Sequence, residues 1–496
     1  MIGKVYLVGA GAGNYGLLTL NSLKYIQTAD VIVYDNLVNR EILLEAKFGC
    51  ETIYVGKVAN NHTLTQDEIN LLLVKKAKEG KFVVRLKGGD PYVFGRGAEE
   101  AQFLIKNNID FEVVSGVSSA LAGPMYAGIP LTHRDYSSSF HVITGHLKAG
   151  ACELNWEAIA NVGGTLVFLM GVANLKTICI NLISNGMAKV TPVAVIYCAT
   201  LPNQKVIVGT LDTIYKEETR SPSIIVVGEV VRLREQLNFF EKRPLFGKTI
   251  VVTRSRVNSS NLVQQLQNLG ANVLQAPTIV IQKIENNMEL DNSITNLLDY
   301  NYIIFTSQNA VDIFFARLFE KNLDCRYLSC LKVVVVGDNT KKVLEGYGIC
   351  ADIMPKNFSA KSLCNELATS LKKTDKILFP TAKNPTSTIQ TELEKLGCLI
   401  DVIPVYETKI DYSSKEELLN IILEKDIDYI TFTSSSTVKN FISLLGEQNL
   451  GHLAKIKLVS IGDTTTKTIQ SYNLETPIQA KNSTIEDMIN CIIEQV

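Results

Sequence analysis

The stretch that most constrains the fold runs from Val83 to Gly97 and reads VVRLKGGDPYVFGRG. Its apolar start predicts a short buried strand, which the sequence GGDP at 88–91 ends at once. Two glycines let a ligand approach the backbone closely, the aspartate supplies an acceptor, and the proline stiffens the turn. In open α/β sheets, ligands bind beyond the carboxyl ends of the strands. The stretch therefore predicts an α/β fold with a ligand loop at this edge; the alternative for GGDP is a plain strand-to-helix turn.

Length and charge restrict the class of protein. At roughly 150 residues per domain, a chain of 496 residues predicts about three domains rather than one core. The formal net charge of −1 argues against a surface for nucleic acid, although a local basic pocket for an acidic substrate stays open. No stretch approaches ~18 consecutive apolar residues, and the N-terminus starts directly with a strand. We therefore expect neither a membrane span nor a signal peptide.

The cysteines and histidines show no metal-site spacing. None of the ten cysteines forms a C-x-x-C pair, and the five histidines are dispersed. Scattered cysteines are typical of small buried side chains in a reducing compartment. We therefore expect a cytoplasmic protein without a bound metal.

The N-terminal segment matches a dinucleotide-binding fingerprint. A β-rich run precedes Gly11, Gly13 and Gly16 in the pattern G-x-G-x-x-G, and a second strand ends about 20 residues later at Asp35. An NAD-dependent oxidoreductase is therefore an alternative that the sequence leaves open. It does not explain the second glycine loop at 88–90.

Seven motifs follow one another through the first half: YLVGAGAG, ADVIVYDNLV, YVGK, VVRLKGGDPYVFGRG, YAGIPLTHR, TLVFLMG and PSIIVVGEVVR. In this order they closely resemble the tetrapyrrole methylases, and within them the uroporphyrinogen-III C-methyltransferases, over about residues 1–243. The resemblance implies two α/β lobes with S-adenosylmethionine in the cleft between them, and a homodimer. The implied cofactor-binding positions are Ala12, Gly88, Gly89, Asp90, Val93, Ser118, Ser119, Met170 and Ala199.

The implied reaction is the attack of a pyrrole carbon on a sulfonium methyl group. A base near the ring nitrogen assists this attack, and the resemblance makes Asp35 the candidate base and Lys57 the candidate acid. Three positions depart from the family pattern. Ala12 lies in a loop that usually reads GPGDP-like, Asn36 replaces an arginine that often follows the acid, and Ser115 replaces the usual proline. Loss of that arginine is expected to weaken the binding of an acidic substrate.

The second half repeats itself. A turn-rich segment at 238–249 predicts a domain boundary near 243. Beyond it, YIIFTS at 302–307 matches YITFTS at 429–434 at an offset of 127 residues. Ile250 matches Ile377 at the same offset. A constant offset predicts two duplicated α/β lobes.

Each copy carries hydroxyl-rich strand ends, FTSQNAV and FTSSSTV, and a Gly-Asp-x-Thr sequence. Hydroxyls and free amides at a helix start can hold an anion, although plain N-capping explains either motif alone.

These pieces, with LFGKTIVVTR, PVYET and IGDTTTKT, resemble uroporphyrinogen-III synthase over about 244–496. The resemblance implies two lobes, one of 244–278 plus 410–496 and one of 279–409. Strands at 277–282 and 403–408 would form the ladder that joins them. The family reaction cyclises hydroxymethylbilane and inverts its last ring, which depends mainly on positioning.

Tyr406 is the candidate that assists the leaving hydroxyl, with a structural tyrosine as the alternative. The implied carboxylate-binding positions are Thr306, Ser307, Thr340, Ser434, Thr464 and Thr465.

The fusion is itself informative, because the product implied for the second half is the substrate implied for the first. The sequence thus predicts a bifunctional enzyme that makes precorrin-2, towards siroheme or cobalamin, from small-molecule tetrapyrroles. The alternatives are the oxidoreductase above and a non-catalytic tetrapyrrole-binding protein with one inactive half.

Overall fold

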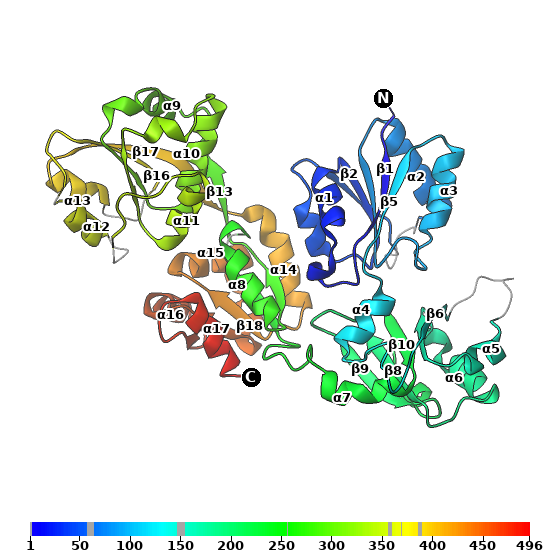
Figure 1. Cartoon of the computed structure of the whole chain (residues 1–496). Helices are drawn as coiled ribbons and strands as arrows, with labels where there is room; N and C mark the ends of the chain where they lie inside the picture. The colour runs from blue at the N-terminus through cyan, green and yellow to red at the C-terminus, as the bar shows by residue number, and fades with distance from the viewer. Residues whose placement is uncertain are drawn as a thin grey trace. The chain divides into compact units, whose positions relative to one another are not determined.

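The computed structural model describes residues 2–56, 64–145, 154–254, 256–355, 360–368, 370–384 and 389–496. Two compact units make up the chain (Figure 1). The first comprises Met1–Ile250, Val263–Val273 and Ile493–Val496, and the second comprises Val251–Leu262 and Leu274–Ile492. The boundary near 243 and the lobe limits stay predictions.

The first unit begins with a parallel five-stranded sheet in the order β3-β2-β4-β1-β5. Its strands are β1 (Val5–Gly9), β2 (Val31–Tyr34), β3 (Glu51–Tyr54), β4 (Val83–Lys87) and β5 (Phe111–Val114). The helices that follow are α1 (Leu20–Thr28), α2 (Gln66–Lys78) and α3 (Gly97–Lys106).

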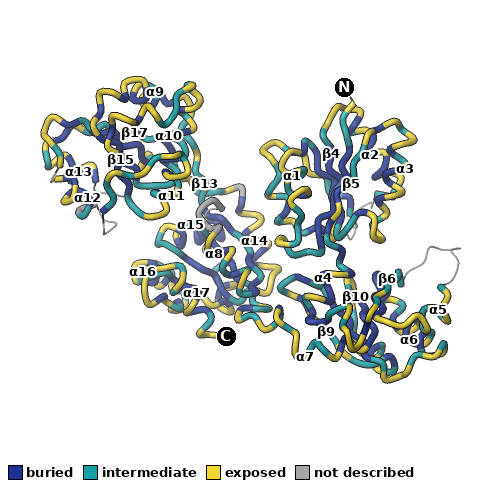
Figure 2. The backbone as a smooth tube through the Cα atoms, viewed as in Figure 1, coloured by how far each residue is buried: buried dark blue, intermediate teal, exposed yellow. Residues whose placement is uncertain are grey.

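Side chains alternate across this sheet, as the two-residue period of a strand requires. Val5 and Leu7 pack with the core beneath α2 and α3, whereas Tyr6 and Val8 pack with the core that includes Ile26 of α1. Figure 2 shows the strands buried between helices with exposed outer faces. Because all five strands run parallel, their carboxyl ends lie at the same edge of the sheet.

The second sheet of this unit is mixed, in the order β6-β7-β10-β8-β9. Its strands are β6 (Phe140–Thr144), β7 (Thr165–Leu169), β8 (Pro192–Tyr197), β9 (Lys205–Thr210) and β10 (Ser223–Val227). The helices of this part are α4 (Ser119–Tyr126), α5 (Trp156–Asn161), α6 (Leu175–Ser184) and α7 (Arg234–Leu237). Its two cores involve Ile178 of α6 on one face and Ala120 of α4 on the other.

The second half contains two further five-stranded sheets. The order in one is β12-β11-β18-β19-β20, built from β11 (Thr249–Val252), β12 (Asn272–Gln275), β18 (Tyr429–Phe432), β19 (Lys457–Ser460) and β20 (Ile478–Gln479). Its helices are α8 (Arg256–Asn268), α14 (Lys415–Glu424), α15 (Ser435–Leu445), α16 (Asp463–Gln470) and α17 (Ile485–Ile493).

The other sheet of the second half has the strand order β13-β17-β16-β14-β15. Its strands are β13 (Ile279–Lys283), β14 (Tyr302–Phe305), β15 (Lys332–Val335), β16 (Lys376–Ala382) and β17 (Leu399–Ile410). Its helices are α9 (Met288–Thr295), α10 (Gln308–Glu320), α11 (Asp338–Gly346), α12 (Ala360–Leu367) and α13 (Ile389–Lys395).

The strand orders confirm the internal duplication. At the offset of 127 residues, β11 corresponds to β16 and β18 to β14, and at an offset of 125 residues (457 − 332) β19 corresponds to β15. These three strands stand in the same order in the two sheets. The expected ladder is also present, because β13 pairs antiparallel with β17 from Ile279↔Ile410 to Lys283↔Tyr406.

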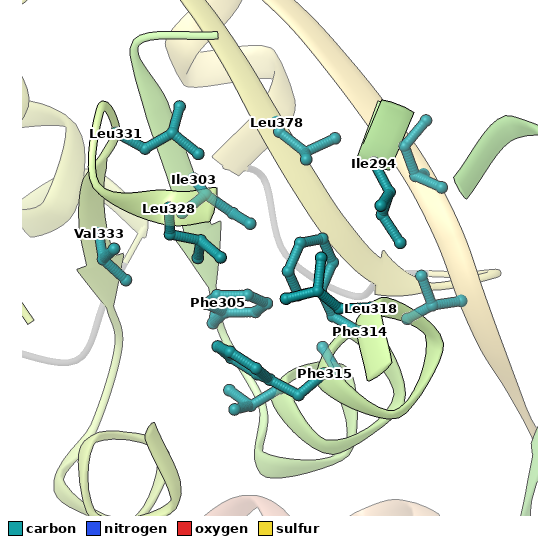
Figure 3. Packing of buried hydrophobic residues seen from close by; sticks show 14 of the residues in the cluster. Ile294, Ile303, Phe305, Phe314, Phe315, Leu318, Leu328, Leu331, Val333 and Leu378 are labelled. Atoms are coloured by element: carbon teal, nitrogen blue, oxygen red, sulfur yellow. The ribbon is translucent and has the colours of Figure 1, made fainter. Parts of the chain in front are cut away.

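An aromatic cluster anchors α10 to its sheet (Figure 3). Phe305 at the end of β14 meets Phe314 and Phe315 of α10, all fully buried, with ring centroids 5.5 and 6.4 Å away. Aromatic packing of this kind fixes the start of α10, which follows the hydroxyl-rich strand end. None of the helices in the described part of the chain has the length and apolar character needed to span a membrane.

Candidate active sites

The two glycine loops of the first unit lie against each other. The amide of Gly89 donates to the carbonyl of Gly11 at 2.7 Å, and the amide of Gly11 donates to the carbonyl of Gly89 at 3.3 Å. A third segment is equally close, since a Cβ on Gly116 would lie 2.3 Å from the Gly89 carbonyl oxygen. These loops meet because β1 is the neighbour of both β4 and β5. Glycine is needed where the three backbones touch.

A Cβ would fit at Gly89 with only ordinary van der Waals contacts. The φ of Gly89 is +71°, a conformation that favours glycine, and a Cβ built on it would find its nearest neighbours at 3.8 Å, the amide nitrogen of Ser119, and 3.9 Å. A ligand can therefore lie against this backbone, flanked by the start of α4. The geometry is compatible with the predicted close approach at Gly89, whereas a Cβ on Gly88 would lie 2.7 Å from Cβ of Leu37, so packing alone already requires that glycine.

Asp90 accepts hydrogen bonds from its own turn and from the loop that follows β5. Its Oδ2 accepts hydrogen bonds from the Ser115 hydroxyl at 2.6 Å and the Gly116 amide at 3.1 Å, and its Oδ1 accepts from the Tyr92 amide at 2.8 Å. Both carboxylate oxygens thus hold the turn together. Ser115, which replaces the proline usual in the family, provides a hydrogen bond to Asp90 that a proline cannot donate.

Three further predicted cofactor-binding residues, Ser118, Ser119 and Val93, differ in how far they are exposed. Ser118 caps α4, accepting from the Ala120 amide at 3.3 Å, and is buried, whereas Ser119 is half-buried. Val93 is 39% exposed in a loop whose neighbour Phe94 has a φ of +56°. Apolar exposure and a strained backbone together are typical of a binding loop.

Met170 and Ala199 follow strands of the second sheet. Met170 is 53% exposed with a φ of +56°, so it is not the core residue that its apolar type alone favours. Ala199 packs against the core that includes Ile224. A left-handed backbone conformation at a methionine costs free energy, and such strained residues are typical of functional positions.

Thr200 joins the two halves of this site and was not predicted. Its hydroxyl donates to the carbonyl of Ala12 at 2.7 Å and accepts from the amide of Asn14 at 3.0 Å, and the residue is fully buried. The first glycine loop is therefore fixed to the turn that carries Ala199. No sequence pattern identifies this threonine, because its partners are backbone groups of a distant loop.

Asp35 ends β2 beside a buried charge network. Its Oδ2 accepts from Nη2 of Arg85 at 3.2 Å, and its side chain remains 27% exposed. Nε of Arg85 and Nζ of Lys87 both donate to Oε1 of Glu100, at 3.2 and 2.8 Å. Burial and the charge of Arg85 lower the pKa of Lys87, which Glu100 opposes.

This network holds Asp35 at the edge of the sheet with one oxygen oriented by a fixed cation. Sequence reasoning missed Arg85, Lys87 and Glu100, although charged residues inside the apolar run of β4 were a signal. Lys57, the candidate acid, lies outside the described residues.

The dinucleotide interpretation does not match this geometry. In that fold the strand with the glycine loop neighbours the strand that ends in the ribose-binding acid. Here β4 lies between β1 and β2. Helix α1 also begins only at Leu20, after the last glycine of the fingerprint, so its N-terminus is not at the loop.

In the second unit, a cavity of about 440 Å³ opens at the carboxyl ends of β14 and β15. It is lined by Arg254, by the four residues from Thr306 to Asn309, and by the five from Val336 to Thr340. Polar side chains and the starts of α10 and α11 thus surround it.

Tyr406 reaches this cavity through Ser307. The tyrosine is buried in β17, and its hydroxyl donates to Oγ of Ser307 at 3.1 Å. Ser307 also caps α10, accepting from the Ala310 amide at 3.2 Å. The capping role and a role at the cavity are therefore compatible for this serine.

Thr340 also belongs to the lining but is only 4% exposed, in the first turn of α11. Gly337, the cap of that helix, provides no side-chain cap. The backbone amides at the start of α11 are thus available to an anion.

The equivalent loops of the other copy form a separate group. Ser434 caps α15 through a reciprocal pair of hydrogen bonds with Thr437, each at 3.2 Å. The hydroxyl of Ser435 donates to the carbonyl of Thr464 at 3.0 Å, while Thr465 is buried. None of these residues lines the cavity at β14 and β15. Among the described residues, no group of three or more His, Cys, Asp or Glu side chains is placed to hold a metal ion.

Comparison with known proteins identifies both halves. The family of tetrapyrrole (corrin/porphyrin) methylases matches residues 4–215, and uroporphyrinogen-III synthase HemD matches residues 260–490. A porphyrin biosynthesis protein HemD of Ruminiclostridium josui is 40% identical over 497 residues, 99% of this chain and 98% of that protein.

Two other relatives match part of the chain. A uroporphyrinogen-III C-methyltransferase of Bacillus subtilis is 42% identical over 352 residues, 70% of this chain and 72% of its own length. The crystal structure of a uroporphyrin-III C-methyltransferase of Thermus thermophilus in complex with S-adenosylhomocysteine is 39% identical. The match covers 47% of this chain and all of that one, with a TM-score of 0.42.

Proposed function

The chain belongs to the family that joins a tetrapyrrole methylase to a uroporphyrinogen-III synthase, and on this premise we propose how its residues divide the work. It is a bifunctional enzyme of tetrapyrrole biosynthesis. The second half cyclises hydroxymethylbilane to uroporphyrinogen III, and the first half methylates that product twice with S-adenosylmethionine to give precorrin-2. The observation that carries this function is the match of a different enzyme family to each half of the chain, together with a relative aligned from end to end.

The absence of a clash for a group placed against Gly89 supports the cofactor site. Bound S-adenosylmethionine supplies an electrophilic methyl group. Gly88 and Gly89 offer backbone without side chains, and Ser119 begins the helix beside them. Exposed Met170 and Val93 provide apolar contact. Asp90 holds the loop in shape and is proposed to contact the ligand as well.

Asp35 is the proposed base of the methylation. It accepts the proton that the pyrrole nitrogen loses as the ring carbon becomes nucleophilic. Arg85 orients Oδ2 from the buried side, while Oδ1 accepts a hydrogen bond from the amide of Leu37 at 3.2 Å. Arg85 is therefore a positioning residue. Lys57 remains the proposed acid.

Tyr406 is the proposed donor to the hydroxyl that leaves hydroxymethylbilane. Its bond to Ser307 directs the phenol towards the cavity, where Thr306 adds a second hydroxyl. Thr340, Ser434, Thr464 and Thr465 are proposed to bind carboxylates with the help of backbone amides. For the buried Thr340 and Thr465, those amides are the stronger donors.

Two further properties belong to the proposal. We expect a homodimer formed through the first half, as the family resemblance implies. We also expect a cytoplasmic location, which the free thiols of the described cysteines support.

Calorimetric titration of the purified full chain tests the cofactor assignment. S-adenosylmethionine should bind with one site per chain, whereas NAD should give no heat of binding above dilution. Binding of NAD without S-adenosylmethionine would overturn the assignment.

A further inference from the structure

The duplication in the second half allows each position to be compared with its counterpart. Strand β11 corresponds to β16, so Arg254 corresponds to Thr381 at the same offset as Ile250 and Ile377. Thr381 is 4% exposed inside β16. One copy therefore carries a cation at the strand end, and the other carries a small neutral side chain.

Arg254 lines the cavity that the other copy's loops form. It follows β11, whereas the rest of the lining follows β14 and β15. In the described lining, it is the single positively charged side chain, and Asp338 is the single negatively charged one. Arg254 forms no ion pair with any described carboxylate, Asp338 included.

Arg254 is half-buried, and no charged group contributes to the shift of its pKa. Burial lowers its pKa, and no neighbouring acid opposes this effect. Arginine stays charged at any ordinary pH, so the charge is retained at a cost in free energy. An anion entering the cavity would remove that cost.

The other donors around Arg254 suit a carboxylate. Thr306 provides a hydroxyl, and the start of α11 has no side-chain cap at Gly337. A guanidinium binds a carboxylate with two parallel hydrogen bonds, which fixes its orientation as well as its position.

We propose that Arg254 binds one carboxylate of hydroxymethylbilane and sets the direction in which this linear substrate lies. The proposal rests on the cyclisation proposed above. A cleft made from two similar copies could accept a linear polyacid in either direction. Because Arg254 has no charged counterpart at Thr381, one direction is favoured, and the reacting end is brought to Tyr406.

Steady-state cyclisation by the full chain tests this, with Arg254→Gln and Arg254→Lys compared with wild type. Arg254→Gln should raise KM for hydroxymethylbilane about 10- to 100-fold, the loss expected for a charge-assisted hydrogen bond. It should also increase the share of uroporphyrinogen I. Arg254→Lys should recover part of the affinity because it keeps the charge.

A matched control is Arg326→Gln, since Arg326 is an exposed arginine of the same unit that pairs with Asp324 at 2.6 Å. This variant should leave KM and isomer ratio unchanged. The thermal midpoint of Arg254→Gln should equal or exceed that of wild type, because an unpaired half-buried charge is removed.

The outcomes separate the two proposals. Wild-type KM and isomer ratio in Arg254→Gln would overturn the role of Arg254, and so would an equal effect of Arg326→Gln. A lower thermal midpoint without rescue by lysine would assign Arg254 to packing. A wild-type chain that does not cyclise hydroxymethylbilane would overturn the proposed function together with this inference.

Discussion

At the residue scale, the first site depends on how Asp35 is held. Arg85 contacts Asp35 and also Glu100, whose second carboxylate oxygen is buried without a hydrogen-bond partner. Glu100 remains in place because Arg85 and Lys87 both donate to its other oxygen. The network can therefore keep its own ion pairs when Asp35 is replaced.

Asp35→Asn should slow methylation of uroporphyrinogen III by about 10²- to 10⁴-fold, the range for loss of a general base. The affinity for S-adenosylmethionine should not change, because Asp35 is assigned to chemistry. Rates are measured by methyl transfer at saturating cofactor. Asp110→Asn is the control, since Asp110 is exposed at the opposite end of the sheet. A wild-type rate in Asp35→Asn would contradict the assignment.

Tyr406→Phe keeps the buried ring and removes the donor to Ser307. Cyclisation should slow, and uroporphyrinogen I, the product formed without catalysis, should accumulate. The ratio of isomer III to isomer I reports the effect.

Tyr302→Phe is the matched control, because it removes another buried phenol of the same unit, which donates to the Ser370 carbonyl at 3.4 Å. An unchanged rate and isomer ratio in Tyr406→Phe would leave Tyr406 a packing residue.

The sequence predicted some site residues and missed others, and the difference has a physical cause. Glycine loops and strand-end acids are visible in the sequence because they restrict the backbone locally. Thr200 and Arg254 act on loops far away in the chain, so only the fold identifies them. The sequence identified Asp90 as an acceptor, but only the structure shows which groups donate to its carboxylate.

At the element scale, the contact between the glycine loops is the main feature of the first site. Runs of apolar residues predicted β1, β2 and β4 correctly. They could not predict that β4 lies between the other two, because strand order is decided by how the helices cover the sheet. That order separates this fold from the dinucleotide-binding one.

Gly89→Val should abolish binding of S-adenosylmethionine in the calorimetric titration. A β-branched residue is strained at a φ of +71°, and its side chain would occupy the place proposed for the ligand. Cyclisation by the second half should continue. Gly49→Val is the control, because Gly49 has a φ of +80° with nothing within 4 Å of an added Cβ. Normal cofactor binding in Gly89→Val would place the ligand elsewhere.

At the scale of the whole molecule, two different activities meet in one chain, and the half that carries one of them is internally duplicated. The repeat in the second half predicted two similar lobes, and the matching strand orders confirm it. The sequence also predicted the order of the two activities, because one product is the other substrate. It could not predict that the hydroxyl loops divide between a cavity with Arg254 and a separate group at α15 and α16.

The central claim is that one chain performs cyclisation and methylation in succession. Incubation of the purified protein with hydroxymethylbilane, with and without S-adenosylmethionine, tests it directly by mass spectrometry and isomer analysis. Without the cofactor, uroporphyrinogen III should accumulate; with it, precorrin-2 carrying two added methyl groups should replace that product. Uroporphyrinogen I alone in both incubations, or isomer III that is never methylated, would contradict the account.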